Sequence, residues 1–253
     1  MNQSADRSEP ILLGYFGHHK CGSTWIYHVL SDVAEQLSIS QLHAHGAYAF
    51  ERDLSRFRLE QGFDLITYVN ANYHYVRDLE VRGVHVVRDP RDLLVSAYFS
   101  HRNSHPTDGW SELEELRQHL RRVPEETGLL LEMEFCSGVL NDLDSWPDQP
   151  PGILRLRFEE MIESEHIAFR TIASHLGLLD RIGEDTLAET VDRWSFESLT
   201  GGRKRGHEDT GHHFRKGVAG DWRNHFTPAI TWAFKQRHND LLLRYGYEAN
   251  NDW

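Results

Sequence analysis

The sequence of 253 residues is poor in cysteine: it contains only Cys21 and Cys136, which lie far apart along the chain. Proteins stapled by disulfides, and zinc sites built from thiolates, need several cysteines at characteristic spacings. Two distant cysteines argue against both classes, so we expect neither a disulfide framework nor a cysteine-rich metal site. The chain must rely on an apolar core, for which its 39% of hydrophobic residues are sufficient.

Positive charge is also scarce, because 27 Lys and Arg stand against 39 Asp and Glu, which gives a formal net charge of -12. Nucleic acids and anionic membranes attract proteins with excess Lys and Arg, so neither is an expected partner, and any phosphate site must be local. No apolar run reaches the roughly 20 residues of a membrane span. Residues 1–10 lack the basic start and apolar centre of a signal peptide. The cytoplasm is the expected location.

Histidine, by contrast, is abundant, with 17 residues, most of which surface composition can explain. No internal repeat, low-complexity tract or Gly/Ser linker divides the chain. We therefore expect a disordered segment over residues 1–10 and one domain over 11–253.

Hydrophobic patterning predicts alternating strands and helices. Short apolar runs indicate strands at 11–16, 38–42, 63–69, 84–87 and 153–158. Helical spacing indicates helices at 23–37, 50–61, 93–99, 164–176, 184–193 and 228–245, with Asp92 as the N-cap of the third. Residues 100–146 are charged and helical, with breaks at Pro106 and Pro124, so we interpret them as an insertion or lid. This alternation predicts a mostly parallel sheet covered by helices on both faces.

A glycine-bounded loop follows the first predicted strand. Gly17 and Gly22 have the spacing of the nucleotide-binding pattern GxxxxGK[ST], but Ser23 takes the place of its lysine and Lys20 lies inside the loop. A loop that closes on a helix N-terminus offers amide groups and the positive end of the helix dipole to an anion, and Ser23 and Thr24 add hydroxyl donors. A plain strand-to-helix turn with an exposed lysine is the alternative.

The segment from His19 to Trp25 resembles the 5'-phosphosulfate loop of the cytosolic sulfotransferases, usually written PKSGTTW. The displaced lysine fits that family and not the NTPases. The resemblance implies an α/β domain of the P-loop nucleotide-binding type. It implies 3'-phosphoadenosine 5'-phosphosulfate (PAPS) as donor, 3',5'-bisphosphoadenosine (PAP) as product, and no required metal. It also implies that Lys20 stabilises the leaving oxygen, that Trp25 stacks on adenine, and that the 5'-phosphate is bound by Cys21, Gly22, Ser23 and Thr24.

Two further segments resemble the motifs of this family. Arg88 and Ser96 fall in a stretch that matches RxxxDxxVSxY, whose Arg and Ser grip the 3'-phosphate. A guanidinium suits that role because it presents forked donors to phosphate. The stretch from Phe214 to Trp222 resembles RKGxxGDW, and it implies a phosphate wrapped by Phe214, Arg215, Lys216 and Gly217. Taken singly, these segments also fit a capped turn and a flexible basic loop.

Weaker similarities lie on the adenine side. Phe158 begins a segment that resembles YEDM, and Trp194 and Phe196 lie in one that resembles TSFE, so all three are implied to contact the base. Phe158 lacks the hydroxyl of the family's tyrosine, and Trp194 replaces a small threonine. The resemblance extends from Leu12 to Tyr247.

The family's catalytic base is missing, because residues 66–73 contain neither the Lys nor the His of its KTH segment. Removal of the acceptor proton needs another group. His28 is the first candidate, because it lies one helical turn beyond Thr24 on the same face; packing against the sheet is the alternative. His43 and His45, after the second predicted strand, come next, and they lack an evident third ligand for a metal. Two weaker candidates are His19 and His74.

The sequence therefore predicts a sulfotransferase that moves a sulfuryl group from PAPS to a hydroxyl or amine of a small-molecule acceptor. A nucleotide-binding module without activity and a P-loop kinase or NTPase are the alternatives. The family's dimer motif KxxxTVxxxE falls at residues 223–232, where Pro228 and Trp232 replace its Val and Glu. Monomer and dimer both remain open.

Overall fold

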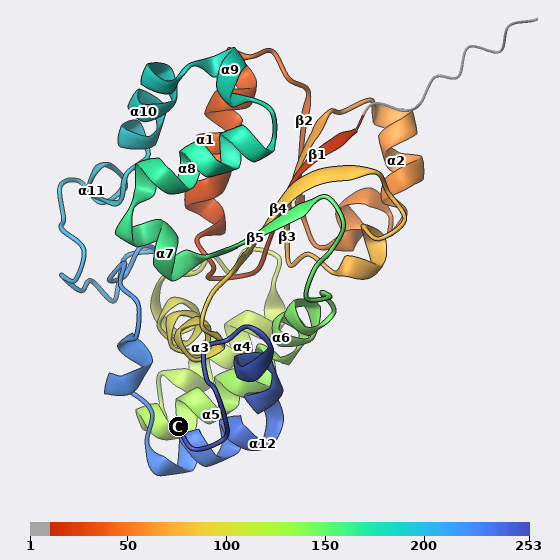
Figure 1. Ribbon diagram of the computed structural model, residues 1–253. Helices are drawn as coiled ribbons and strands as arrows, with labels where there is room; N and C mark the ends of the chain where they lie inside the picture. Colours follow the sequence, from red (N-terminus) through yellow and green to blue (C-terminus); the bar gives the residue numbers. More distant parts are fainter. Residues whose placement is uncertain (1–10) are drawn as a thin grey trace, which may run out of the picture.

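The computed structural model describes residues 11–253, so the disorder predicted for residues 1–10 lies outside the described part. At its centre is a five-stranded sheet in the order β2-β3-β1-β4-β5 (Figure 1), and every neighbouring pair of strands is parallel. The strands are β1 Leu12–Gly17, β2 Gln41–His45, β3 Leu65–Val69, β4 Val81–Val87 and β5 Ile153–Arg157. The predicted α/β class with a parallel sheet is confirmed.

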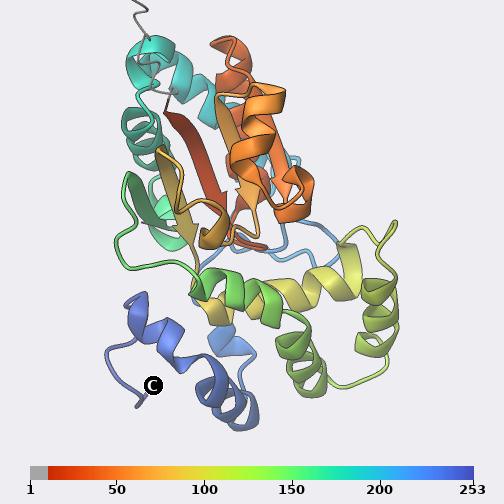
Figure 2. The ribbon, with the colours of Figure 1, turned by 90° about the vertical axis from the view of Figure 1, so that its right-hand side faces the viewer.

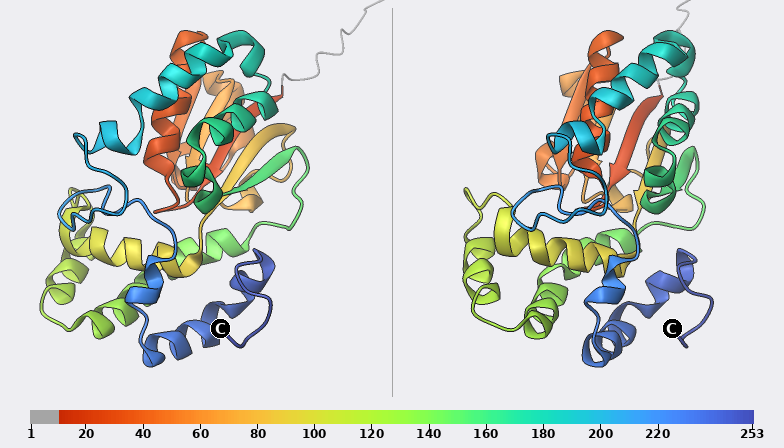
Figure 3. Two further views of the ribbon diagram at one scale, coloured as in Figure 1. Left: turned by 60° about the vertical axis from the view of Figure 1, so that its left-hand side comes forward. Right: turned by 90° about the vertical axis from the view of Figure 1, so that its left-hand side faces the viewer.

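Helices cover both faces of the sheet, and each face has its own apolar cluster. Figure 3 shows the face covered by α1 Ser23–Gln36, α7 Phe158–Glu163, α8 Glu165–His175, α9 Leu179–Ile182 and α10 Glu184–Arg193. Figure 2 shows the opposite face, which is covered by α2 Leu54–Gln61 and the short turns η1 Ala47–Phe50 and η2 Tyr73–Tyr75. Burial on both faces explains why the inner strands β1, β3 and β4 are largely apolar, whereas the edge strands β2 and β5 carry alternating polar residues.

A third group of helices lies beyond the carboxyl ends of the strands (Figures 1 and 2). It contains α3 Pro90–Phe99, the π-helical turn η3 Ser100–Ser104, α4 Ser111–Leu120, α5 Glu125–Phe135, α6 Ser137–Asp144, η4 Asp221–Asn224 and α12 Pro228–Arg244. The short α11 Phe196–Leu199 follows α10 instead, and its Leu199 packs against the apolar cluster of the first face. Apolar residues of α3, α4, α5 and α12 form one cluster. The predicted helical segment 100–146 thus packs where ligands of open parallel sheets bind. Within residues 11–253, no helix combines the length and the apolar character needed to cross a membrane.

The second strand begins later than predicted, at Gln41 instead of Ser38. The cause is Ser38, whose φ of 54° lies in the left-handed region and reverses the chain after α1. This shift of three residues places His43 and His45 within β2, and not after it.

The prediction that Asp92 is the N-cap of the third helix is wrong. The helix starts earlier, because Pro90 suits its first turn, and Asp89 is the N-cap, with a side-chain oxygen 2.9 Å from the backbone N of Arg91. Asp92 instead lies inside α3, and its carboxylate accepts hydrogen bonds from the backbone N–H groups of Gly220 (2.6 Å) and Trp222 (2.8 Å). Asp92 therefore fastens the segment 214–222 to α3.

Removal of this carboxylate should loosen that attachment. The change Asp92→Ala leaves two amide groups without acceptors, and we expect it to lower the free energy of unfolding by about 2–4 kcal/mol. Urea unfolding followed by circular dichroism measures the loss. As a control, Asp78→Ala removes an exposed carboxylate and should change stability by less than about 0.5 kcal/mol. Equal stability of the two variants would contradict this role of Asp92.

Candidate functional site

The loop between β1 and α1 has the backbone that an anion site requires. Lys20 and Gly22 both have positive φ, 63° and 78°. At Gly22 a Cβ atom would lie 2.8 Å from the Phe158 ring, so glycine is needed for space as well as for conformation. Gly22 also provides no side-chain cap for α1, which leaves the first amide groups of the helix available to an anion.

A pocket of about 950 Å³, part of it open to solvent, lies beside this loop. Most of the predicted donor-binding residues line it: Lys20, Gly22, Ser23, Thr24, Trp25, Arg88, Ser96, Phe158, Phe196, Phe214, Arg215, Lys216 and Gly217. Segments that are distant in the sequence thus meet at the carboxyl edge of β1 and β4. Among the residues predicted to hold the donor, Cys21 and Trp194 do not line the pocket.

Arg88, just after β4, connects two walls of the pocket. Its guanidinium donates to the backbone oxygen of Lys20 (2.8 Å) and to that of Val218 (3.4 Å). The guanidinium carbon also lies 4.8 Å from the centroid of the Phe158 ring. The remaining guanidinium nitrogen of Arg88, Nε, is buried and has no hydrogen-bond partner within residues 11–253. An unpaired buried donor of a cation fits a phosphate oxygen.

Lys20 projects toward α3 and the turn that follows it, where its Nζ donates to Ser100 Oγ over 3.0 Å. Burial, together with the charges of Arg88 and Arg215, lowers the pKa of Lys20 to about 7. A negative group bound beside these cations would favour the charged form and raise the pKa again. The lysine is therefore placed to respond to an anion.

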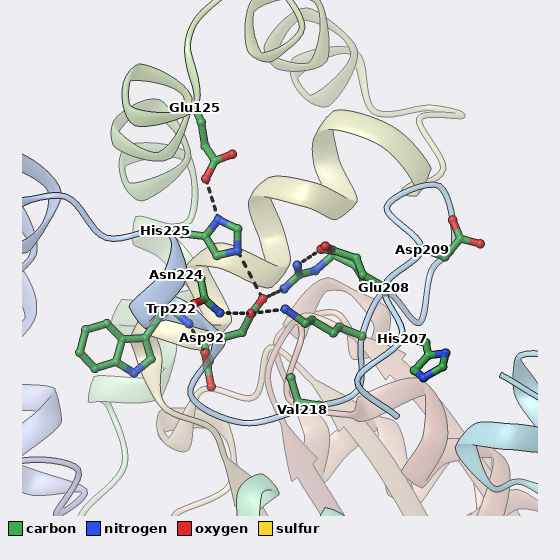
Figure 4. A network of polar contacts seen from close by, with 12 residues as sticks. Asp92, Glu125, His207, Glu208, Asp209, Val218, Trp222, Asn224 and His225 are labelled. Atoms are coloured by element: carbon green, nitrogen blue, oxygen red, sulfur yellow. Dashed lines mark hydrogen bonds and ion pairs between the residues drawn. The ribbon is translucent and has the colours of Figure 1, made fainter. Parts of the chain in front are cut away.

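Arg215 and Lys216 line the pocket but are already paired. Both pair with Asp221, with Lys216 Nζ 2.6 Å from Asp221 Oδ1, and Arg215 also contacts Glu208. Figure 4 shows the surroundings of this network, with Glu208, Asn224 and His225 labelled. Burial alone would raise the pKa of Asp221, but hydrogen bonds hold it well below its usual range; they come from His225, Lys216, Asn224 and Arg215. A bound phosphate would have to share these two cations with a carboxylate.

The aromatic wall of the pocket differs from the predicted one. Trp25 and Phe196 line it, and Trp25 packs edge-to-face on Phe169 at 4.9 Å between ring centroids. Trp194 instead lies flat against His28, with centroids 4.4 Å apart, and its Nε1 donates to Asp32 Oδ2 over 2.9 Å.

Arg205 is a pocket residue that the motifs did not indicate. It donates to the backbone oxygen of Gly217 over 3.0 Å, and its guanidinium carbon lies 4.9 Å from the centroid of the Phe196 ring. At Gly217, whose φ is 67°, a Cβ atom would approach both of these side chains within 3 Å. The basic character of residues 201–220 was the sequence signal for this wall.

The structure separates the histidines proposed as bases. His28 is stacked on Trp194 and does not line the pocket, and burial lowers its pKa. His43 and His45 contact each other through their Nε2 atoms (2.9 Å), but only His45 lines the pocket. Cys21 is also turned away: it is free, buried and packed with Val87 and Leu93.

Three other histidines surround Lys20. His19, His105 and His213 line the pocket, and only His19 stood among the sequence candidates. His213 Nε2 lies 3.3 Å from Thr24 Oγ1, and His19 Nε2 lies 3.1 Å from Nε2 of the buried His101. The donor atoms of His19, His101 and His105 all lie within 4.8 Å of one another. The sequence feature that could have indicated this cluster is the pair His101 and His105, which closely follows Ser96 and Ser100.

The profile of the family described as "Sulfotransferase domain" matches residues 12–245. The chain belongs to the sulfotransferase family. Cytosolic sulfotransferase 3 of Arabidopsis thaliana is 28% identical over 61% of this chain, and sulfotransferase 2A6 of Mus musculus is 27% identical over 66%. These matches span 51% and 58% of the two relatives, so the chain corresponds to little more than half of their length.

Two solved structures share the fold. Mouse sulfotransferase SULT7A1 complexed with PAP aligns with a TM-score of 0.56 at 18% identity, over 93% of this chain and 86% of its own. Retinol dehydratase, in complex with androsterone and inactive cofactor PAP, aligns with a TM-score of 0.52 at 16% identity, over 91% and 80%. The predicted α/β domain with a P-loop-type fold is thereby confirmed.

Proposed function

We propose that this sulfotransferase moves a sulfuryl group from PAPS to a hydroxyl or amine of a small-molecule acceptor. One observation carries the proposal: Lys20, Arg88 and Arg215 come from distant segments and line the same pocket. This arrangement suits a nucleotide with phosphate groups at two positions. The PAP named in the two structural relatives supports the choice of donor.

The residues present fit this donor. Ser23 and Thr24 line the pocket, and with the first amides of α1 they would hold the 5'-phosphate. Arg88 Nε and Ser96 suit the 3'-phosphate, with help from the segment 214–217. Trp25, Phe158 and Phe196 provide the aromatic wall for adenine. When bound, PAPS supplies the activated sulfuryl group.

The chain's own contribution to the reaction is charge stabilisation and proton removal. Lys20 and the loop amides oppose the negative charge that develops on the departing phosphate. A pocket histidine takes the acceptor proton, and of the three favoured sequence candidates only His45 lines the pocket. His105, which lies between η3 and α4, is the pocket residue from the segment 100–144, and through it this segment would border the acceptor side of the site.

The test is turnover with the intact chain. We expect incubation with PAPS and a panel of phenols, aliphatic alcohols and amines to yield PAP and a sulfated product, which mass spectrometry detects. Tight PAP binding in calorimetry without transfer to any acceptor or to water would favour a binding module. Hydrolysis of ATP, or phosphorylation of an acceptor, would favour the kinase or NTPase alternative.

A further inference from the structure

Behind Lys20, a chain of hydrogen bonds runs from the pocket into the protein interior. His19 Nε2 lies 3.1 Å from His101 Nε2, and His101 Nδ1 lies 2.7 Å from Glu132 Oε1. The three residues come from the loop after β1, the π-helical turn η3 and the helix α5. His101 and Glu132 are 1% and 0% exposed, whereas His19 lines the pocket. π-Helical turns are frequent at functional sites, and this one positions the central histidine.

The partners of these atoms determine where the protons lie. A carboxylate can only accept hydrogen bonds, so the proton between Glu132 and His101 belongs to His101 Nδ1. A neutral His101 then has a bare Nε2, and the proton between the two rings belongs to His19 Nε2. His19 Nδ1 is left with its lone pair, and it makes no hydrogen bond to any residue in the range 11–253. This nitrogen is free to accept a proton from a bound molecule.

Glu132 gives the chain its direction. Its carboxylate is buried; Oε1 contacts His101 and the Cys136 thiol (2.8 Å), and Oε2 has no hydrogen-bond partner within the described residues. A buried charge without a counterion is unfavourable. Protonation of His101 would convert the contact into an ion pair and so offset that cost.

From this geometry we propose that His19, His101 and Glu132 form the proton relay that serves as the catalytic base; the inference rests on the proposed sulfuryl transfer. The acceptor oxygen bonds to sulfur while the bond from sulfur to the bridging oxygen breaks, and that electron pair leaves with the 5'-phosphate. The acceptor proton passes to His19 Nδ1, and the His19 Nε2 proton passes to His101 Nε2. The imidazolium of His101 then pairs with Glu132 until the proton returns to solvent. His19 is the catalytic residue of this relay, and His101 and Glu132 are positioning residues.

The surroundings explain why a relay is needed. Burial lowers the pKa of His19 well below its usual value, and His101, Lys20, His105 and His213 act in the same direction. His19 is therefore neutral at pH 7 but a weak base alone. The other polar groups that face the relay are the Cys136 thiol and Arg117, whose Nε donates to the His101 backbone oxygen over 2.6 Å. Glu132 is the acidic member of the relay, and its negative charge stabilises the proton on His101, which His19 alone could not hold.

A first test needs no acceptor. In protein labelled with ¹⁵N-histidine, NMR should show His101 as the Nδ1–H tautomer and His19 as the Nε2–H tautomer. The change Glu132→Gln removes the charge and should shift the His19 titration to lower pH. The matched control Glu134→Gln, on the same helix but exposed, should leave it in place. A His19 ring protonated on Nδ1 in the wild type would overturn the relay.

A second test uses acceptors of different acidity. The change His19→Gln should slow sulfation of phenol by at least about 100-fold, because the base is lost. The loss should be far smaller for 4-nitrophenol, which ionises near neutral pH without help. Glu132→Gln should lower kcat for phenol and move the acid limb of the pH profile to lower pH, with PAP affinity retained. A defect in packing alone would not move that limb.

Two results would count against the relay in distinct ways. Equal losses for phenol and 4-nitrophenol in His19→Gln would show that His19 does not act as a base. A divalent ion that copurifies with His19, His101 and His105, and whose chelation abolishes turnover, would replace the relay with a metal centre. A wild type that transfers sulfate to no acceptor contradicts the proposed function instead, and the NMR tautomers still decide the relay.

Discussion

Lys20→Met should lower kcat for PAPS-dependent transfer by about 10²–10³-fold, the effect of losing one preorganised donor to a developing charge. PAP affinity should fall much less, because in the proposed site Arg88, Ser96 and the segment 214–217 would hold the other phosphate. The lowered pKa of Lys20, about 7, does not weaken this expectation, since the bound donor restores its charge. Initial rates of PAP formation and calorimetry with PAP measure the two quantities.

The matched control is Lys204→Met. Lys204 is exposed in the same polar segment as Arg205, does not line the pocket, and its loss changes the net charge of the protein equally. We expect its kcat to equal that of the wild type. Should Lys20→Met lose PAP affinity as much as turnover, Lys20 would be a simple binding charge and not a stabiliser of the leaving group.

Arg88→Met should weaken PAP binding by about 10²–10³-fold, because truncation of a buried cation that pairs with a phosphate typically costs about 2–5 kcal/mol. The loss should be specific to the 3'-phosphate: affinity for adenosine 5'-monophosphate, which lacks that group, should change much less. Calorimetry with both nucleotides measures the difference.

Arg82→Met is a suitable comparison for Arg88, since Arg82 lies on β4, the strand that ends just before Arg88, is exposed and does not line the pocket. It should bind both nucleotides as the wild type does. Equal losses for PAP and adenosine 5'-monophosphate in Arg88→Met would mean that Arg88 acts only by joining the loop at Lys20 to the segment at Val218.

Local pattern was enough to predict much of this fold. The apolar runs that became β1 and β4 are bounded by Gly17 and by Arg88, so both the strands and the loops after them could be located. The loops after β1 and β4 must lie close together, because parallel strands bring their carboxyl ends to one edge of the sheet. The pocket at that edge follows from the sequence in outline.

The prediction was least informative where a contact depends on a distant element. Helical spacing placed His28 on the face of Thr24, but only the folded chain shows Trp194, from the end of α10, stacked over that histidine. Similarly, the pairing of His19 with His101 and Glu132 joins three elements separated by 82 and 31 residues. Contacts between residues so far apart in the sequence leave no trace in the local pattern of apolar residues from which helices and strands are predicted.

The paired state of Arg215 and Lys216 has a consequence for the influence of salt. Cations that stand alone hold dissolved anions, and the release of those ions into solution favours binding at low ionic strength. Here the carboxylate of Asp221 takes the place of a dissolved anion beside Arg215 and Lys216, so the counterion belongs to the chain itself. A nucleotide that reaches these two cations exchanges places with a carboxylate and displaces few ions from solution. Its affinity should therefore depend on ionic strength less steeply than the number of cations in the pocket suggests.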